Sequence, residues 1–376
     1  MDTFRIGIAD RDLADLRDRL ARTRWPDHLA GVGWDYGTEP GYLRELVDYW
    51  ATGFDWRRAE RRLNSYPQFR AVVGDRRVHF VHRRGRGPAP LPVLVLHGWP
   101  GSFVQMLDLL PLLADPAASG GAADDAFDVV VGSLPGFAFS DAATRPGMSE
   151  VAMAHVFHRL MTEVLGYRRY AVRGGDFGAG IAEQLAAHYP ESVVGIHVTS
   201  ETPRAQDPPA DPSPAIRDYL RAVERWQATE VGYGRQQSTK PQTLAYPLND
   251  SPAGLAGWLV EKFRRWSDCD GDVERRFSKD QLLTNISIYW FTATIGSSMR
   301  LYYETARQSP GRPQVPTARL MSTRDMVPTP REWVERRSRV DRWTEVDRGG
   351  HFLEWEEPQL VADDMRAFFR PLRAHG

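Results

Sequence analysis

Residues 170–178 read YAVRGGDFG, an apolar run that leads directly into two glycines, an aspartate and a third glycine. A small-x-nucleophile-x-small spacing is typical of a sharp strand-to-helix turn, because small flanking residues let the backbone bend and raise the central side chain above the sheet. The central residue here is Asp176 rather than a serine. A carboxylate suits attack on a saturated carbon, because the alkyl ester that forms can later be hydrolysed at its carbonyl. The stretch therefore predicts a nucleophilic aspartate at a strand-to-helix turn.

The apolar run at residues 92–96 is short and continuous, which is typical of a buried parallel strand. It opens directly into HGWPGS at residues 97–102. In an α/β-hydrolase the loop after this strand gives one backbone N–H to an oxyanion hole, and the residue after the nucleophile gives the other. We therefore expect the backbone N–H groups of Trp99 and Phe177 to be the two donors.

A candidate base, His351, follows two glycines and a strand-like run at residues 342–346. Asp325 lies 26 residues earlier, shortly after a strand-like run at 318–321, and would hold the tautomer of the histidine. The chain order of nucleophile, acid and histidine is the one that this fold's topology requires. Three other carboxylates also precede the histidine and remain alternatives for the acid: Asp341, Glu345 and Asp347.

Strand-like and helical runs alternate through the middle of the chain, which predicts a mostly parallel sheet with flanking helices, the α/β class. The strand-like runs are Val78–His82, Val93–His97, Phe127–Val131, Tyr170–Arg173 and Val193–Val198. A helix is expected from about Glu150 to Leu165, with Ser149 as its cap. Two further strands and a helix at Pro358–Phe369 are expected to complete the core.

Two proline-rich stretches, at residues 202–214 and 309–313, interrupt this alternation. The periodicity between them is mostly helical, which predicts a helical lid inserted in the core. Near the start of the chain, the spacing of Leu13, Leu16 and Leu20 predicts a helix capped by Asp10. We therefore expect an N-terminal extension at 1–75 that packs on core and lid, core segments at 76–201 and 313–376, and a lid at 202–312.

Motifs throughout the chain resemble those of one enzyme group. They are Arg5–Ile8, Asp10–Pro26 and Asp55–Asn64 in the extension, His97–Pro100 and Gly175–Gly178 in the core, and Gly232-Tyr233, Ser238–Pro241, Leu248–Pro252 and Glu261–Phe263 in the lid. Together they resemble the microsomal-type epoxide hydrolases of the α/β-hydrolase superfamily, which carry an extra N-terminal domain. The resemblance covers nearly the whole chain, and it implies an α/β-hydrolase fold with an inserted helical lid.

The resemblance also implies a role for each candidate residue. Asp176 becomes the nucleophile, His351 the base and Asp325 the acid that orients it, while Tyr233 and Tyr302 become the lid tyrosines that hold the epoxide oxygen. The reaction implied is hydrolysis of an epoxide by water to a vicinal diol, through an ester on the aspartate and without a metal or an organic cofactor. The neighbouring tyrosines Tyr289 and Tyr303 compete for the second tyrosine role.

Composition limits the partners. The 376-residue chain has a net charge of −1, which gives no reason to expect a nucleic acid or a membrane surface as partner. It has no apolar stretch of about 18 residues, and its start carries acidic residues instead of a basic leader, so we expect no membrane anchor and a soluble, cytoplasmic protein. A homodimer is left open. Cys269 is the only cysteine, so no intramolecular disulfide can form.

A calcium loop is the one metal site that the sequence suggests, at Asp268, Asp270 and Asp272. We reject it because the glycine falls two positions early and Lys279 stands where the terminal glutamate is required.

The substrate is the least determined feature. Six aromatic residues in the lid suggest a bulky or aryl epoxide: Trp226, Tyr246, Trp258, Trp266, Trp290 and Phe291. The chain also resembles epoxide hydrolases of actinomycete natural-product pathways, including those of enediyne antibiotics, with general detoxification as the alternative role. A haloalkane dehalogenase would use the same aspartate and histidine but commonly has an indole where this chain has Phe177. A ligand-binding relative without catalysis is the alternative from another class, and an ester hydrolase would call for serine at position 176.

Overall fold

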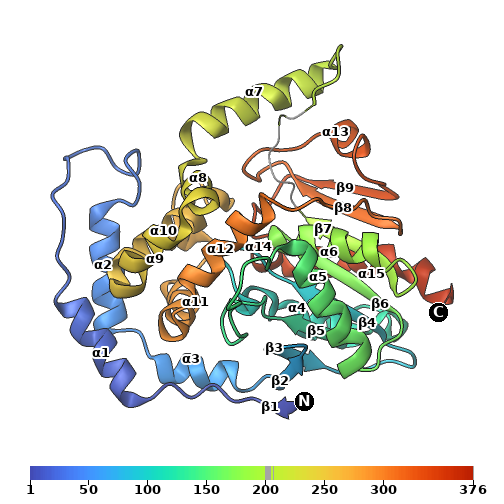
Figure 1. Ribbon diagram of the computed structural model, residues 1–376, viewed down its shortest axis with the longest axis horizontal. Helices are drawn as coiled ribbons and strands as arrows, with labels where there is room; N and C mark the ends of the chain where they lie inside the picture. Colours follow the sequence, from blue (N-terminus) through green and yellow to red (C-terminus); the bar gives the residue numbers. More distant parts are fainter. Residues whose placement is uncertain (200–204, 206, 376) are drawn as a thin grey trace.

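The computed structural model describes residues 1–199, 205 and 207–375 of the chain (Figure 1). A nine-stranded sheet runs through the protein in the order β1-β2-β3-β5-β4-β6-β7-β8-β9. The strands are β1 (Asp2–Thr3), β2 (Gln68–Val73), β3 (Arg76–Arg83), β4 (Leu91–Leu96), β5 (Phe127–Gly132), β6 (Tyr170–Gly175), β7 (Val193–Thr199), β8 (Thr317–Ser322) and β9 (Arg342–Val346). The six strands from β5 to β9 in this order are parallel. The α/β-hydrolase fold predicted from the sequence is confirmed.

The parallel strands are apolar because helices cover them on both faces. Every residue of β5, β6, β7 and β8 is buried, and the strand-like runs expected at β3 to β9 are all found. The helices of the core are α4 (Leu109–Ala114), α5 (Glu150–Arg159), α6 (Phe177–His188), α13 (Arg331–Glu335), α14 (Leu353–Glu356) and α15 (Pro358–Phe369). Helix α5 packs on α6, and α4 packs on α15. The sequence placed α15 correctly, whereas α5 continues as a π-helical turn at Leu160–Val164.

The N-terminal region contributes to both the sheet and the lid. Strands β1 and β2, which the sequence analysis did not predict, extend the sheet in antiparallel fashion at its edge. A two-residue turn with Gly74 at φ +66° joins β2 to β3, so the boundary expected at residue 75 lies inside a hairpin. Helices α1 (Asp10–Ala21), α2 (Pro40–Thr52) and α3 (Trp56–Leu63) pack against lid helices. In Figure 1, α1 and α2 lie on the side of the lid away from the sheet, and α3 lies below α11 and leads toward β2.

Two helix caps differ from the sequence expectation. Leu13, Leu16 and Leu20 are buried on one face of α1 as expected, but Ala9 is the residue before the helix and Asp10 is its first residue. The Asp10 carboxylate pairs with Arg57 of α3 and therefore makes no cap hydrogen bond. Ser149 does precede α5, although its side chain makes no cap hydrogen bond either.

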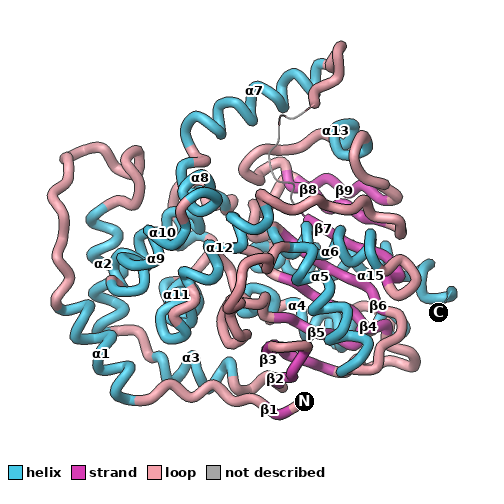
Figure 2. Tube along the Cα trace, in the orientation of Figure 1, coloured by secondary structure: helices cyan, strands magenta, loops and turns pink. Residues whose placement is uncertain are grey.

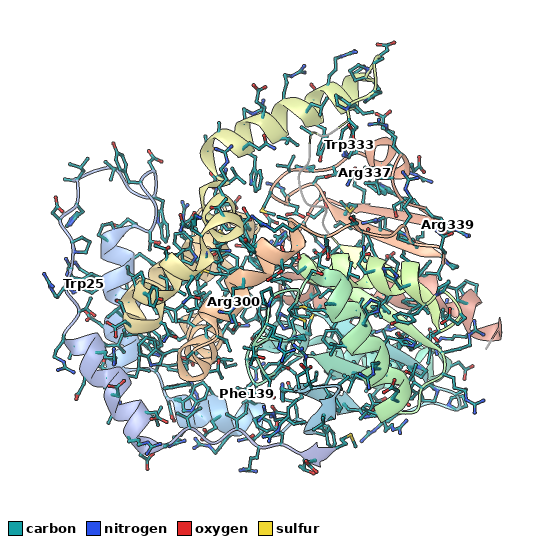
Figure 3. All side chains as sticks on the ribbon, in the orientation of Figure 1. Trp25, Phe139, Arg300, Trp333, Arg337 and Arg339 are labelled. Carbon is teal, nitrogen blue, oxygen red and sulfur yellow. The ribbon has the colours of Figure 1, made fainter. Side chains whose placement is uncertain are left out.

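Helices of the lid region lie between β7 and β8 in the chain (Figure 2). They are α7 (Pro214–Thr229), α8 (Gly232–Thr239), α9 (Pro241–Asp250), α10 (Pro252–Trp266), α11 (Lys279–Thr292) and α12 (Ile295–Thr305). Helix α12 packs on α8 and α9, and α10 packs on α2 and α11. Trp333 of α13 lies near α7, with its ring centroid 5.2 Å from that of Tyr219 (Figure 3). The expected core end at 201 and the first part of the expected proline-rich break fall on residues outside the described ones.

Within the part of the chain that the structure describes, no helix is both long enough and apolar enough to cross a membrane. The three aspartates considered for calcium serve other contacts. Asp268 binds Arg276 and the N–H of Gly349, Asp270 binds Arg275, and Asp272 accepts from the N–H of Glu274.

Candidate active site

The nucleophile candidate lies at a strained turn between β6 and α6. Asp176 has φ +52° and ψ −127°, a conformation that costs a residue with a side chain on the order of 1–3 kcal/mol. A Cβ at Gly174 would collide with the carbonyl of Gly178, and a Cβ at Gly178 would collide with the carbonyl of Leu96. The two small positions are therefore required by close backbone approach, as the spacing predicts.

Loop residues after β4 contact the Asp176 carboxylate. The Trp99 N–H donates to its Oδ1 at 2.9 Å, and the Trp99–Pro100 peptide is cis. Gly98 lies so close that a Cβ there would collide with the carboxylate. Phe177 is the first residue of α6, where backbone N–H groups have no acceptor within the helix. Both expected oxyanion donors are thus next to the aspartate. Trp99 is hydrogen-bonded to its carboxylate, and Phe177 is the next residue in the chain.

His351 lies between two carboxylates. Its Nε2 is 3.2 Å from Asp176 Oδ2, and its Nδ1 is 3.0 Å from Asp325 Oδ1. The histidine side chain is 3 % exposed and that of Asp176 23 %, so the nucleophile is the more open of the two. All three residues follow parallel strands, whose carboxyl ends meet at one edge of the sheet.

The competing acids lie elsewhere. Asp341 accepts from the N–H of Thr317 and pairs with Arg339, which places it at the start of β9 instead of its end. Glu345 and Asp347 line a surface recess together with Thr323 and Arg348. The structure therefore brings Asp325, among the four candidates, to the histidine.

The charges around His351 determine its protonation. Burial disfavours the imidazolium, but the two neighbouring carboxylates, Asp325 and Asp176, outweigh burial and raise the pKa of His351 well above its ordinary value. The two carboxylates therefore favour the protonated imidazole, which can form an ion pair with each of them. Any event that removes the charge of Asp176 lowers the pKa of the histidine.

The rings of Tyr233 of α8 and Tyr302 of α12 pack on Trp99 and Phe177, respectively. The Tyr233 ring stacks on Trp99 with centroids 5.6 Å apart, and the Tyr302 ring meets Phe177 edge-on at 4.7 Å. The two tyrosine rings meet edge to face with centroids 5.9 Å apart. Burial raises the pKa of both phenols, and the negative charge of Asp176 raises it further. Both tyrosines therefore keep their protons while the aspartate is charged.

The two competing tyrosines have other partners. Tyr289 donates its hydroxyl to the carbonyl of Gly101 at 2.8 Å, and the Tyr303 ring carries the guanidinium of Arg307 on its face. The geometry therefore pairs Tyr302 with Tyr233, although the residues before and after Tyr302 gave no local signal for that choice.

Among the six lid aromatics, Trp266 contacts the site directly. Its ring centroid lies 5.1 Å from that of Tyr233, 6.1 Å from that of Trp99 and 5.3 Å from that of His351. Tyr246 is 69 % exposed, which argues against a role in lining a buried site. The others have different contacts. Trp226 packs beside the buried residues of its own helix, α7, and Trp258 donates to Gln237. Trp290 lies under Arg19, and Phe291 packs on Trp56.

Three buried charged side chains near the site were not found from the sequence. Arg173, inside β6, forms an ion pair with Glu354 of α14, and both are fully buried behind the nucleophile turn. Lys262 of α10 is buried with its Nζ 4.7 Å from the Tyr233 ring centroid. A charged residue within an apolar strand, as at Arg173, was the available signal, because an unpaired buried charge would be too costly.

Comparison with known families gives two matches. The family model described as epoxide hydrolase N terminus matches residues 1–106. The model described as alpha/beta hydrolase fold matches residues 92–245.

Individual relatives are similar over nearly the whole chain. The chain is 41 % identical to a putative epoxide hydrolase of Stigmatella aurantiaca, with 99 % of this chain and 85 % of the relative covered. It is 33 % identical to epoxide hydrolase 1 of Sus scrofa, with 97 % and 87 % covered. The crystal structure of juvenile hormone epoxide hydrolase from the silkworm Bombyx mori matches with a TM-score of 0.85 and 31 % identity over 99 % of this chain and 94 % of that one. The structure of Aspergillus niger epoxide hydrolase matches with a TM-score of 0.88 and 27 % identity over 99 % and 96 %.

Proposed function

Since this chain belongs to the epoxide hydrolase family of α/β-hydrolases and is an epoxide hydrolase, we propose that it opens its substrate through a covalent ester on Asp176. The observation that carries the proposal is the surroundings of that carboxylate. One oxygen is held by the Trp99 N–H and the other faces His351, so the group is fixed at the strand end. A fixed carboxylate is suited to in-line attack on a ring carbon.

Ring opening also needs an acid at the departing oxygen, because an alkoxide in a buried pocket would be very costly. Tyr233 and Tyr302 are buried, their raised pKa keeps both phenols protonated, and their rings meet edge to face with centroids 5.9 Å apart. As Asp176 forms its bond to carbon, it loses the negative charge that raises the pKa of both phenols. One tyrosine therefore becomes a better proton donor at the moment when negative charge develops on the epoxide oxygen, and such binding strengthens in the transition state.

The same loss of charge activates the base. Once Asp176 is an ester, one of the two carboxylates that hold the proton on His351 is gone, so the pKa of the histidine falls. The imidazolium of His351 gives its proton to the tyrosine that was deprotonated during ring opening. The neutral His351, oriented by Asp325, then takes a proton from water, and the hydroxide attacks the ester carbonyl. The backbone N–H groups of Trp99 and Phe177 would stabilise the oxyanion, at about 3–4 kcal/mol for one such donor. Collapse breaks the bond between the carbonyl carbon and the substrate oxygen, and the departing alkoxide takes the proton from His351 to give the diol. The new carboxylic acid of Asp176 then passes its proton to His351, which restores the starting state.

For the substrate, we propose a bulky or aryl epoxide, on the support of the aromatic rings of Trp99, Phe177 and Trp266. Trp99 and Phe177 contact Tyr302, and Trp266 contacts His351. A role in natural-product biosynthesis, such as that of enediynes, and a cytoplasmic location remain proposals from the sequence. Styrene oxide is a suitable first substrate, and release of its diol is the expected result. Release of halide from a haloalkane would instead favour a dehalogenase, and binding without turnover would favour a ligand-binding relative.

The covalent step is tested with His351→Gln. This variant should alkylate Asp176 but stall at the ester, so intact-protein mass spectrometry should show an adduct equal to the substrate mass. Unmodified protein, under conditions where the wild type turns over, would contradict the ester mechanism in which His351 acts only in hydrolysis.

A further inference from the structure

Besides Asp325, which contacts the His351 side chain, the buried carboxylate of Glu356 binds the backbone of the loop that carries His351. Glu356 ends α14, five residues after the histidine, and its side chain is fully buried. Its Oε2 accepts from the Gly350 N–H at 2.9 Å, and its Oε1 accepts from the Phe352 N–H at 3.1 Å. The peptide N–H groups on both sides of His351 therefore donate to one side chain.

The same carboxylate also reaches the lid. Glu356 Oε2 accepts from the N–H of Asp268 at 2.8 Å, and Asp268 lies just after α10. In return, Asp268 Oδ2 accepts from the Gly349 N–H at 3.1 Å, and the carbonyl of Trp266 accepts from the His351 N–H at 2.8 Å. Four consecutive N–H groups, at residues 349–352, thus donate either to Glu356 or to the segment that ends α10.

Close packing at Gly350 accompanies these bonds. A Cβ on Gly350 would collide with the carbonyl of Trp266 and the N–H of Asp268. The histidine loop and the end of α10 are therefore in direct backbone contact, and a residue larger than glycine would separate them.

A buried carboxylate is costly unless hydrogen bonds satisfy it. Burial raises the pKa of Glu356 to about 7, while the backbone N–H groups of Asp268, Gly350 and Phe352 and the nearby Arg276 act in the opposite direction. Glu357, the next residue, offers a contrast, because its carboxylate binds the side chains of Arg276 and Arg348. Of the two adjacent glutamates, Glu356 therefore binds the backbone of the His351 loop, and Glu357 binds two arginine side chains.

We propose that Glu356 is a positioning residue for ester hydrolysis, which fixes the backbone of the His351 loop and ties it to the end of α10. The inference rests on the proposed function, in which His351 acts only in the second half of the reaction. Alkylation uses Asp176 and the tyrosines, and Asp176 is held independently by its own strained turn and by the Trp99 N–H. Loss of the Glu356 contacts should therefore affect hydrolysis more than alkylation.

Glu356→Gln is the most direct test. An amide has one acceptor oxygen and one NH2 donor, so the NH2 must face either the Phe352 N–H or the pair from Gly350 and Asp268. At least one buried N–H then loses its acceptor, and the His351 loop moves to accommodate the change. Hydrolysis should slow on the order of 10- to 100-fold, since small misplacements of a catalytic group have effects of this size. Alkylation should stay within about twofold, so the ester should accumulate.

The measurement is rapid-quench mass spectrometry with styrene oxide, which gives the alkylation and hydrolysis rate constants separately. Wild type, Glu356→Gln and His351→Gln are compared with Glu357→Gln, the matched control, which should show the wild-type ratio of the two rates. If Glu356→Gln does not fold, Glu356→Asp takes its place, because it keeps the charge but is too short to reach all three donors.

The outcomes separate the inference from its premise. An absence of adduct in His351→Gln would contradict the ester mechanism itself. An adduct there, together with an unchanged ratio in the Glu356 variant, would overturn the positioning role alone. Equal slowing of alkylation and hydrolysis in that variant would also overturn it, because the residue would then support the fold in general.

Discussion

The two sides of the active site are built differently. On the sheet side, Asp176, Asp325 and His351 sit on loops that follow parallel strands, and each is held by short polar contacts. On the lid side, Tyr233 and Tyr302 come from helices and are held mostly by contacts between rings. The sheet side carries the charged catalytic residues, and the lid side carries the neutral proton donors.

This difference corresponds to the two half-reactions. Charges need fixed positions because their interaction energy depends on distance in a buried site. Proton donors need to release the product oxygen afterwards, and helices of a lid are suited to such small adjustments. We therefore expect changes on the lid side to slow alkylation and changes on the sheet side, beyond the nucleophile, to slow hydrolysis.

The largest effect is expected from removing both lid phenols. Tyr233→Phe and Tyr302→Phe should each slow alkylation by about 10- to 100-fold, and the double variant by at least about 1000-fold, because a positioned acid contributes roughly 10²–10⁴. The check is the single-turnover rate of adduct formation in a His351→Gln background.

Tyr303→Phe is the matched control, because its ring contacts Arg307. It should alkylate as fast as the parent. Slow alkylation by Tyr303→Phe, together with normal alkylation by Tyr302→Phe, would mean that Tyr303 is the second proton donor. The lid side of the site would then consist of Tyr233 and Tyr303.

A smaller effect is expected on the sheet side from Asp325→Asn. The amide cannot stabilise the imidazolium and presents either a donor or an acceptor to Nδ1, so His351 loses its orienting charge. Hydrolysis should slow about 100-fold while alkylation changes little, so the ester should be the main species during turnover. If quench experiments instead show slower alkylation and no ester, Asp325 acts on the nucleophile and the comparison fails.

The sequence predicted the sheet side better than the lid side, and the reason is local. Asp176 is surrounded by glycines that its turn requires, so a few adjacent residues identify it. Asp325 was one of four carboxylates before the histidine, and the three-dimensional order of β8 and β9 distinguished it from Asp341. Tyr233 and Tyr302 rested on the family resemblance, because their pairing depends on how α8 and α12 pack.

The edge strands and the buried glutamates were not predicted from the sequence, because both depend on contacts between distant segments. Strands β1 and β2 are a short pair at the antiparallel edge, where a partly exposed strand lacks the continuous apolar run of a central one. The sequence analysis singled out neither Glu354 nor Glu356, because their burial depends on partners in β6 and at the end of α10. Arg173 within an apolar strand was a local sign of the first partner, and the end of α10 gave no such sign of the second.

The smallest expected effect is the change in the hydrolysis rate with pH. Hydrolysis requires neutral His351, whose pKa falls once Asp176 is esterified, so hydrolysis should rise with pH and level off above that pKa. Alkylation requires protonated phenols, whose raised pKa keeps it active at neutral and moderately alkaline pH. Below the histidine pKa, hydrolysis should fall about tenfold per pH unit. The ester fraction in acid-quenched enzyme should therefore increase as pH falls, and an increase toward high pH would contradict the assignment of the base.

The central claim is that the oxygen given to the diol comes from Asp176. Hydrolysis of the ester at its carbonyl transfers a carboxylate oxygen to the product and leaves a solvent oxygen in the protein. A single turnover in heavy-oxygen water, with enzyme in excess over styrene oxide, should give unlabelled diol and a heavy-oxygen label in the peptide that contains Asp176. Labelled diol with an unlabelled peptide would show that water attacks the epoxide directly, with Asp176 as a general base.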